Sequence, residues 1–209
     1  MRTKSLALVA AGILAGVCLI GTVARSQDKP ADGKPAAPAG ADAAAMQSMM
    51  EAAAPGAHHK ILDSMTGRFK YTNKFKMDPS QDWVTSDGMY EGNMCLGGRY
   101  LTYTVKGPMM GMDFEGMGCI GYDNLLQKYV SGWIDNMGTS LLRAEGTASA
   151  DGKTITFEGE MLDPMTKKPA KYKNVYEIKS ADEFTMRMVA PSPDGKMFEC
   201  MVIEFKKEK

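Results

Sequence analysis

The stretch that decides the fold is GMYEGNMCLGGRYLTYTVKGPMMGMDFEGMGCIGYDNLLQKYVSGWIDNMG, residues 88–138. It divides into four apolar-rich segments of strand length, separated by breaks that begin at Gly97, Gly107 and Tyr122. Glycine, proline, aspartate and asparagine at these breaks favour tight turns. Connections this short leave no room for crossover helices, so neighbouring strands must run antiparallel.

The same rhythm continues on both sides of this stretch. From Gly67 to Met77, aromatic residues alternate with lysine and threonine, which predicts a strand with one buried and one solvated face. Asp151-Gly152 and Asp194-Gly195 are hairpin turn signals further along the chain. Ten strands are predicted, over residues 67–77, 84–96, 99–106, 112–122, 127–137, 140–150, 153–161, 172–179, 183–190 and 197–206.

Ten consecutive strands in one open sheet would expose an apolar face and two unpaired edges. Closing the sheet on itself removes both. We therefore predict an all-β protein, an antiparallel up-and-down barrel of about ten strands, with a two-sheet sandwich as the alternative. A short helix is expected from Pro55 to Gly67, because proline suits a first helical turn and apolar residues follow at helical spacing. This helix is predicted to plug one end of the barrel.

The N-terminal segment has the features of a secretory signal peptide. Arg2 and Lys4 precede an apolar run over residues 6–23, and small residues follow up to Ser26. Residues 1–26 are therefore predicted to be cleaved, which makes the protein periplasmic or secreted and leaves no membrane span in the mature chain. Retention of this run as a membrane anchor, or lipidation at Cys18, are the alternatives.

Two further segments follow the predicted cleavage site. Residues 27–54 are rich in alanine and proline and poor in large side chains, so they cannot offset the entropy of ordering and should form a flexible tether. A frayed helix over 43–54 is compatible with the alanine and methionine content. Residues 55–209 are long enough for a single barrel domain.

Charge and cysteine content exclude several classes. The whole chain has 25 basic and 25 acidic residues, and removal of residues 1–26 leaves 22 basic against 25 acidic. A general nucleic-acid binder would need a basic surface, so no nucleic-acid partner is expected. Cys95, Cys119 and Cys200 lack the spacing of a redox or metal pair and are expected to be buried thiols, with one disulfide and one free thiol as the alternative.

No catalytic constellation stands out. His58 and His59 are adjacent on the predicted helix, so they point about 100° apart and cannot chelate one metal together. Methionine clusters can bind Cu(I), but methionine also fills irregular interiors well. We prefer the interpretation that these methionines fill the barrel interior. No metal site and no catalytic residue is predicted. An enzyme using carboxylates such as Asp135, Glu145 or Glu158 in the barrel mouth stays open as an alternative.

A candidate ligand site follows from the strand period. Trp133 and Asp135 are two residues apart and must share a face, which we predict to be the interior one. Arg99, Tyr103 and Arg143 lie on strands that are near neighbours and are expected to complete a polar-aromatic patch, with an arginine pairing the carboxylate. Mostly apolar surroundings with a few polar groups are typical of small-molecule pockets. A solid core with these charges at the rim is the alternative.

Several motifs resemble one bacterial family. They are PGAHHKILDSMTGRFKYTNKFKMDP from Pro55, NMCLGGRYL from Asn93, GMDFEGMGCIGYDN from Gly111, KYVSGWIDNMGT from Lys128 and PMTKKP from Pro164. Together they resemble domain-of-unknown-function family 1579, from Pro55 to the C-terminus. The resemblance implies a calycin-like barrel, related to lipocalins and fatty-acid-binding proteins, and no settled biochemical role. Haem-binding barrels of that superfamily use a histidine on a late strand. This sequence has no histidine after His59, so neither haem nor another cofactor is expected.

Three functional classes stay open on the sequence alone. The first is a binding protein for a small apolar or amphipathic ligand. The second is a structural or interaction module whose barrel is filled by its own side chains. The third is an enzyme acting in the barrel mouth. A cavity of several hundred Å³ would distinguish the first class from the second.

Overall fold

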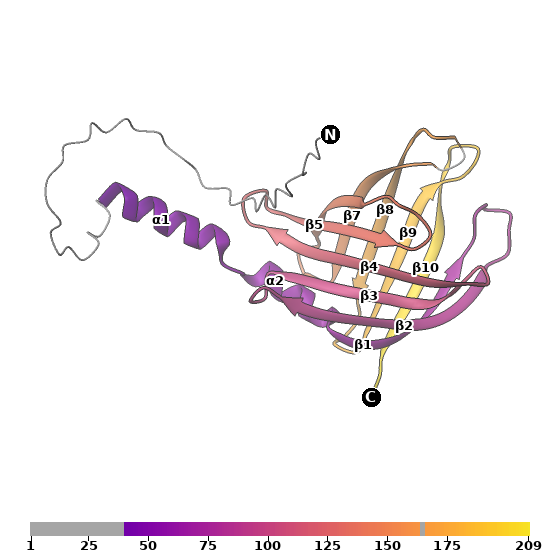
Figure 1. Cartoon of the computed structure of the whole chain (residues 1–209), viewed down its shortest axis with the longest axis horizontal. Coiled ribbons are helices and arrows are strands. Elements are labelled where there is room, and N and C mark those ends of the chain that lie inside the picture. The colour runs from indigo at the N-terminus through magenta and orange to yellow at the C-terminus, as the bar shows by residue number, and fades with distance from the viewer. Residues whose placement is uncertain (1–39, 164–165) are drawn as a thin grey trace, which may run out of the picture. The chain divides into compact units, whose positions relative to one another are not determined.

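The computed structural model describes residues 40–163 and 166–209. The predicted signal peptide, residues 1–26, and the first part of the predicted tether, residues 27–39, lie outside the described residues. Ten antiparallel strands close into a barrel in the order β1-β10-β9-β8-β7-β6-β5-β4-β3-β2 (Figure 1). This confirms the predicted barrel and excludes the two-sheet sandwich.

The strand bounds match the predicted segments closely. They are β1 (Gly67–Phe75), β2 (Val84–Cys95), β3 (Tyr100–Met109), β4 (Met112–Asp123), β5 (Lys128–Asp135), β6 (Leu142–Ala148), β7 (Thr154–Leu162), β8 (Pro169–Ile178), β9 (Glu183–Pro191) and β10 (Met197–Lys207). β8 begins three residues before the predicted start at Tyr172. The reason is that Ala170 and Tyr172 are buried while Lys171 between them is exposed, so the strand alternation already starts in the lysine-rich loop.

The helix allowed over residues 43–54 is α1, which spans Gly40–Ala53. Its exposed side chains contribute nothing to the barrel core, but its last carbonyl groups are hydrogen-bonded. Asn124 Nδ2 donates to the Ala52 and Ala54 carbonyls at 2.8 Å each, and Arg99 Nε donates to the Ala53 carbonyl at 2.9 Å. Free carbonyls at a helix C-terminus need such partners. No helix in the described part of the chain is both long and apolar enough to cross a membrane.

The predicted plug consists of α2 (Ala57–Ile61) and the 3-10 helix η1 (Leu62–Met65), which lie at one end of the barrel (Figure 1). Leu62 and Met65 are completely or almost completely buried in the main core. Tyr90 on β2 donates its hydroxyl to the Met65 carbonyl at 2.8 Å, and Tyr129 on β5 donates to the His58 carbonyl at 2.9 Å. Apolar burial and two buried tyrosine hydroxyls therefore fix the plug to the strands.

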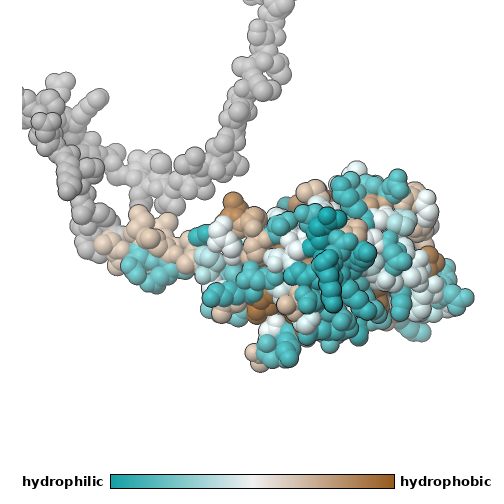
Figure 2. Space-filling model, turned by 90° about the horizontal axis from the view of Figure 1, so that it is seen from below, coloured by the Kyte–Doolittle hydropathy of each residue, from teal (hydrophilic) through white to brown (hydrophobic). Residues whose placement is uncertain are grey.

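The face of the barrel seen in Figure 2 is predominantly hydrophilic, with scattered apolar residues. Cross-strand ion pairs join outward side chains, among them Lys106–Glu115, Lys128–Glu145 and Lys173–Glu158 at 2.6–2.9 Å. Exposed pairs of this kind contribute little stability. The free energy of folding must therefore come mainly from the inward side chains.

Aromatic rings inside the barrel lie over glycines of neighbouring strands. Several rings have a glycine as a direct strand partner, among them Tyr71 and Gly88, Tyr103 and Gly118, Phe157 and Gly146, and Tyr172 and Gly159. A Cβ atom added at Gly118 would lie 2.1 Å from Cζ of Tyr103, and one added at Gly116 would lie 2.3 Å from Cζ2 of Trp133. Both distances are shorter than any real contact, so these glycines are required to make room for the rings.

Replacing Gly118 with alanine should therefore destabilise the barrel by displacing Tyr103. We expect a loss of about 1–3 kcal/mol in the free energy of unfolding, the usual cost of overpacking a core. The matched control is Gly132→Ala on the adjacent strand, where a Cβ would contact only Leu141 Cδ1 at 3.7 Å. Urea unfolding of both variants measures the difference, and equal stability of the two would contradict this role of Gly118.

The plug should also make stability depend on pH. His59 is buried, its Nδ1 accepts the Gly56 N–H at 3.0 Å, and burial lowers the pKa of its imidazole below the ordinary 6.5. Between the folded-state pKa and 6.5, the unfolded chain binds more protons than the folded chain. The free energy of unfolding should therefore decrease as pH falls through this window.

His59→Gln tests this assignment, because glutamine can accept the same backbone N–H but does not titrate. Urea unfolding of both proteins at about pH 7.5 and about pH 5 brackets the ordinary histidine range. The wild type should lose more stability on acidification than His59→Gln does. An identical pH dependence in the two proteins would show that His59 is not responsible.

Candidate functional site: the barrel cavity

The barrel encloses a cavity of about 280 Å³ on the side away from the plug. At the plug end the interior is filled by large side chains that are 0–1% exposed: Leu62, Met65, Phe69, Tyr129, Phe157 and Phe184. Towards the opposite end the walls carry methionines, including Met109, Met186, Met188 and Met201. The cavity lies where these flexible side chains replace the rigid core. Its volume is just below the usual range of about 300–1,000 Å³ for ligand sites, so a bound molecule would be compact.

The cavity wall is mostly aromatic and apolar. Four rings form a continuous row along it: Tyr90, Tyr103, Trp133 and Phe114, with neighbouring centroids 5.4–6.4 Å apart and planes within 28° of parallel. Tyr103 and Trp133 each have a glycine of β4 beneath one face. Both rings also line the cavity, so a ligand there would contact aromatic surface.

Trp133 and Asp135 lie together at this wall, where the sequence places them. Trp133 Nε1 donates a hydrogen bond to Oδ2 of Asp135 at 2.7 Å, and the Met137 backbone N–H donates to Oδ1 at 3.0 Å. Both side chains line the cavity, and Tyr103 lies beside Trp133 as expected. The two hydrogen bonds fix the orientation of the carboxylate at the cavity.

Tyr103 also faces Tyr176 of β8 across the cavity. Their hydroxyl oxygens are 3.4 Å apart, so one donates a long hydrogen bond to the other. Burial raises the pKa of both phenols, that of Tyr103 well above its ordinary value. Both hydroxyls therefore stay protonated at neutral pH, and the pair offers the cavity a neutral polar group.

Two asparagines of the cavity wall have buried oxygens without a partner. Oδ1 of Asn73 on β1 and Oδ1 of Asn174 on β8 are inaccessible, and neither accepts a hydrogen bond from any residue in 40–163 or 166–209. An unsatisfied buried acceptor costs about 1–3 kcal/mol. Both residues line the cavity, but a donor on a bound molecule reaches either oxygen only after the side chains that cover it move.

Arg99 and Arg143 do not join this patch, contrary to the sequence prediction. Arg99 lies at the plug end, where it donates to the Ala53 carbonyl and to the Leu96 carbonyl at 3.0 Å. Arg143 points outward, because the inward residues of β6 are Leu142, Ala144 and Gly146. Strand alternation groups residues into faces, but it cannot tell which face is inward. In the described residues no arginine or lysine lies within 4.0 Å of the Asp135 carboxylate.

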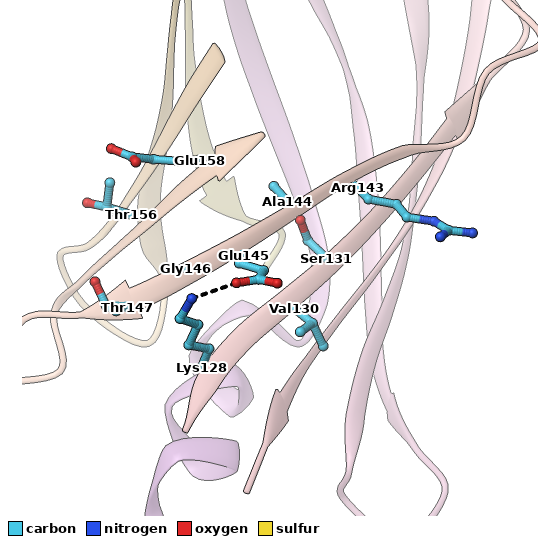
Figure 3. Close-up of a pocket in the computed structure, with 10 residues that line it drawn as sticks. All are labelled: Lys128, Val130, Ser131, Arg143, Ala144, Glu145, Gly146, Thr147, Thr156 and Glu158. Carbon is cyan, nitrogen blue, oxygen red and sulfur yellow. Dashed lines mark hydrogen bonds and ion pairs between the residues drawn. The ribbon is translucent and has the colours of Figure 1, made fainter. Parts of the chain in front are cut away.

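Arg143 instead borders a second hollow, on the outer face of β5, β6 and β7 (Figure 3). There Lys128 Nζ lies 2.6 Å from Oε2 of Glu145, and Arg143 points away from this pair. Glu158, on the same face, is paired with Lys173. The hollow is open and hydrophilic, and lysines already neutralise its carboxylates. It is therefore a weaker candidate for a ligand site than the barrel cavity.

The positions of the carboxylates also limit which groups could take part in catalysis or metal binding. Asp135 faces the cavity while Glu145 and Glu158 face solvent, so Asp135 cannot form an acid-base pair with either of them. Glu145 and Glu158 are cross-strand partners on the outer face, and each is paired with a lysine. Within the described residues, no group of three or more histidine, cysteine, aspartate or glutamate side chains could hold a metal ion.

The three cysteine thiols of the described residues do not line the cavity. Cys95, Cys119 and Cys200 are all free, but only Cys200 is buried as expected. Cys95 and Cys119 are half-buried because they alternate with the inward residues Met94 and Ile120 and so face outward. Cys200 Sγ donates to the Met188 carbonyl at 3.5 Å, and burial raises its pKa to about 11, so its thiolate is scarce at neutral pH.

The family model described as "protein of unknown function (DUF1579)" matches residues 54–207. The chain belongs to the DUF1579 family. No curated protein matches its sequence significantly. Among solved structures, Rv2717c from M. tuberculosis is similar, with a TM-score of 0.56 and 15% identity over 75% of this chain and 100% of that one. A redesigned β-barrel aligns with a TM-score of 0.37 and 12% identity over 73% of this chain and 96% of that one. At these identities the likeness to Rv2717c shows the fold alone.

Sequence reasoning overlooked the two asparagines, although one of them carries a readable signal. Asn73 interrupts the apolar face formed by Phe69, Tyr71 and Phe75, because it stands at an inward position of β1. A polar residue on the buried face of a strand is unusual and indicates a hydrogen-bonding task. Asn174 gives a weaker signal, since its strand is predicted to begin only at Tyr172.

If the asparagine oxygens serve a ligand, replacing them should not weaken the fold. Asn174→Leu removes a desolvated acceptor and should leave the melting temperature of the ligand-free protein unchanged or higher. The control is Asn136→Leu. The Asn136 side chain accepts the Glu115 N–H at 3.1 Å and donates to the Asp113 carbonyl at 2.9 Å. Asn136→Leu should therefore lose about 1–2 kcal/mol in the free energy of unfolding. Calorimetry compares the two, and an equal loss in Asn174→Leu would contradict the assignment.

Proposed function

We propose that this DUF1579 protein binds one small, largely apolar ligand inside its barrel. The single observation that carries this proposal is the barrel cavity, whose wall combines apolar and aromatic side chains with the Asp135 carboxylate and the asparagines Asn73 and Asn174. Aromatic faces and methionines supply apolar contact, and a few polar groups supply orientation. This combination is the usual composition of small-molecule sites.

The structural-module alternative explains this interior less well. A barrel filled for its own stability would close the space with side chains, as the plug end does with Phe69, Tyr129 and Phe184. A cavity and unsatisfied acceptors both reduce stability. Their presence together in one place supports a task other than folding.

The location of this binding function also belongs to the proposal. The apolar run over residues 6–23, with Arg2 and Lys4 before it, supports export to the periplasm or beyond. A binding protein in such a compartment would capture or carry a small molecule outside the cytoplasm. Determination of the N-terminus of the exported protein would test this part of the proposal directly.

A cavity-filling variant tests the binding function. Val105 is 7% exposed and lines the cavity, so Val105→Phe should occupy space that a ligand needs. The control is Thr104→Phe, one residue earlier on β3 and therefore on the outer face. Both proteins and the wild type would be purified from the native host and weighed by native mass spectrometry.

We expect a small-molecule adduct on the wild type and on Thr104→Phe but not on Val105→Phe. As a second measurement, uncharged 2-phenylethanol should change the fluorescence of Trp133 in a Trp83→Phe background, where Trp133 is the sole tryptophan. A wild-type protein without any adduct, and without a fluorescence response up to millimolar 2-phenylethanol, would contradict the proposal.

A further inference from the structure

We propose that the ligand carries a positive charge: a compact organic ammonium whose charged group lies between the Asp135 carboxylate and the ring faces of Trp133 and Tyr103. This inference rests on the proposed binding function and deepens it by naming the ligand class. Three features of the cavity support it: its charge, the aromatic surface beside that charge, and the absence of a competing partner.

The first feature is the charge of the wall. Among the described residues that line the cavity, Asp135 is the only one with a formal charge. Asp135 is half-buried. A ligand over its carboxylate would remove it further from water, which is costly unless a cation or hydrogen-bond donors compensate the charge. The indole N–H and one backbone N–H are two neutral donors, so the negative charge itself is not balanced. A ligand cation would provide that balance.

The carboxylate still has capacity for such a ligand. An ionised carboxylate offers about four lone-pair directions, of which Trp133 Nε1 and the Met137 N–H use one on each oxygen. No lysine or arginine in residues 40–163 or 166–209 competes for the others at ion-pair distance. An ammonium N–H can therefore donate to Asp135 without displacing a protein partner.

The aromatic surface beside Asp135 favours the same charge. The ring centroids of Tyr103 and Trp133 are 5.8 Å apart and those of Trp133 and Phe114 are 6.4 Å apart, with planes 22–28° from parallel. Ring faces attract cations, and the indole face does so most strongly. The indole N–H donates to a carboxylate, which increases the electron density of the ring and strengthens this attraction. The remaining apolar wall can receive the hydrocarbon part of the ligand.

An anionic ligand would meet the opposite conditions. A fatty-acid carboxylate needs a cation or several donors at its buried end, and the described wall has no cationic side chain. Asp135 would repel it in a setting where screening by salt is weak. A neutral alcohol can donate one hydrogen bond to Asp135 but gains neither the ion pair nor the cation–π attraction. The expected order of affinity is therefore ammonium, then alcohol, then carboxylate.

Three probes of nearly equal shape test this order: 2-phenylethylammonium, 2-phenylethanol and 3-phenylpropanoate. They would be titrated at neutral pH into the Trp83→Phe protein, with Trp133 fluorescence and calorimetry as readouts. The ammonium adds an ion pair and a cation–π attraction to the hydrogen bond that the alcohol also makes, so it should bind about tenfold or more tightly than the alcohol. The carboxylate should bind more weakly than the alcohol.

Asp135→Asn removes the charge and should reduce the preference for the ammonium over the alcohol to within about threefold, since a neutral amide leaves only cation–π attraction. The matched control is Asp113→Asn, which removes an exposed carboxylate at the same end of the barrel and should keep the full preference. Binding of the alcohol by Asp135→Asn confirms that the cavity is intact in that variant.

The outcomes separate the two proposals. An ammonium preference that is lost in Asp135→Asn and kept in Asp113→Asn supports the inference. An alcohol or carboxylate that binds as tightly as the ammonium overturns the inference and leaves the binding function standing, and so does a preference that Asp135→Asn does not change. A protein that binds none of the three probes contradicts the proposed function itself.

Discussion

Close packing of aromatic rings onto glycines is the constraint on which the rest of the barrel depends. Tyr103 over Gly118 and Trp133 over Gly116 illustrate it: each ring occupies the space that a Cβ atom would need. Tyr103 also reaches across the interior, where its hydroxyl meets that of Tyr176 on the opposite wall. The cavity lies beside these rings, and both Tyr103 and Trp133 line it.

The two ends of the barrel divide the tasks of stability and binding. At one end, α2 and η1 close the barrel with Leu62 and Met65, and tyrosine hydroxyls fix them there. At the other, methionines and polar groups surround empty space, at a cost in stability that the packed end must offset. The partnerless oxygens of Asn73 and Asn174 add to that cost. Such a separation is typical of proteins in which a site conflicts with folding.

The fold could be predicted from the sequence because its signals are local. Alternation over residues 67–77 and turn residues such as Asp151-Gly152 define strands without knowledge of their neighbours. The site was predicted in part: Trp133, Asp135 and Tyr103 do line the cavity, whereas Arg99 and Arg143 do not. Alternation assigns Arg143 to a face but cannot show that this face is the outer one. The role of Gly116 and Gly118 depends on strand register, which a single sequence does not specify.

The central claim is that the cavity next to Trp133 and Asp135 is a ligand site and not a packing defect. A high-resolution crystal structure of the protein purified from its own host tests it most directly. The expected result is density for a non-protein molecule in the cavity, within hydrogen-bond distance of Asp135 or of Oδ1 of Asn73 or Asn174. A cavity that has collapsed, with methionine side chains filling it and the asparagine oxygens bonded to the protein, would contradict the account.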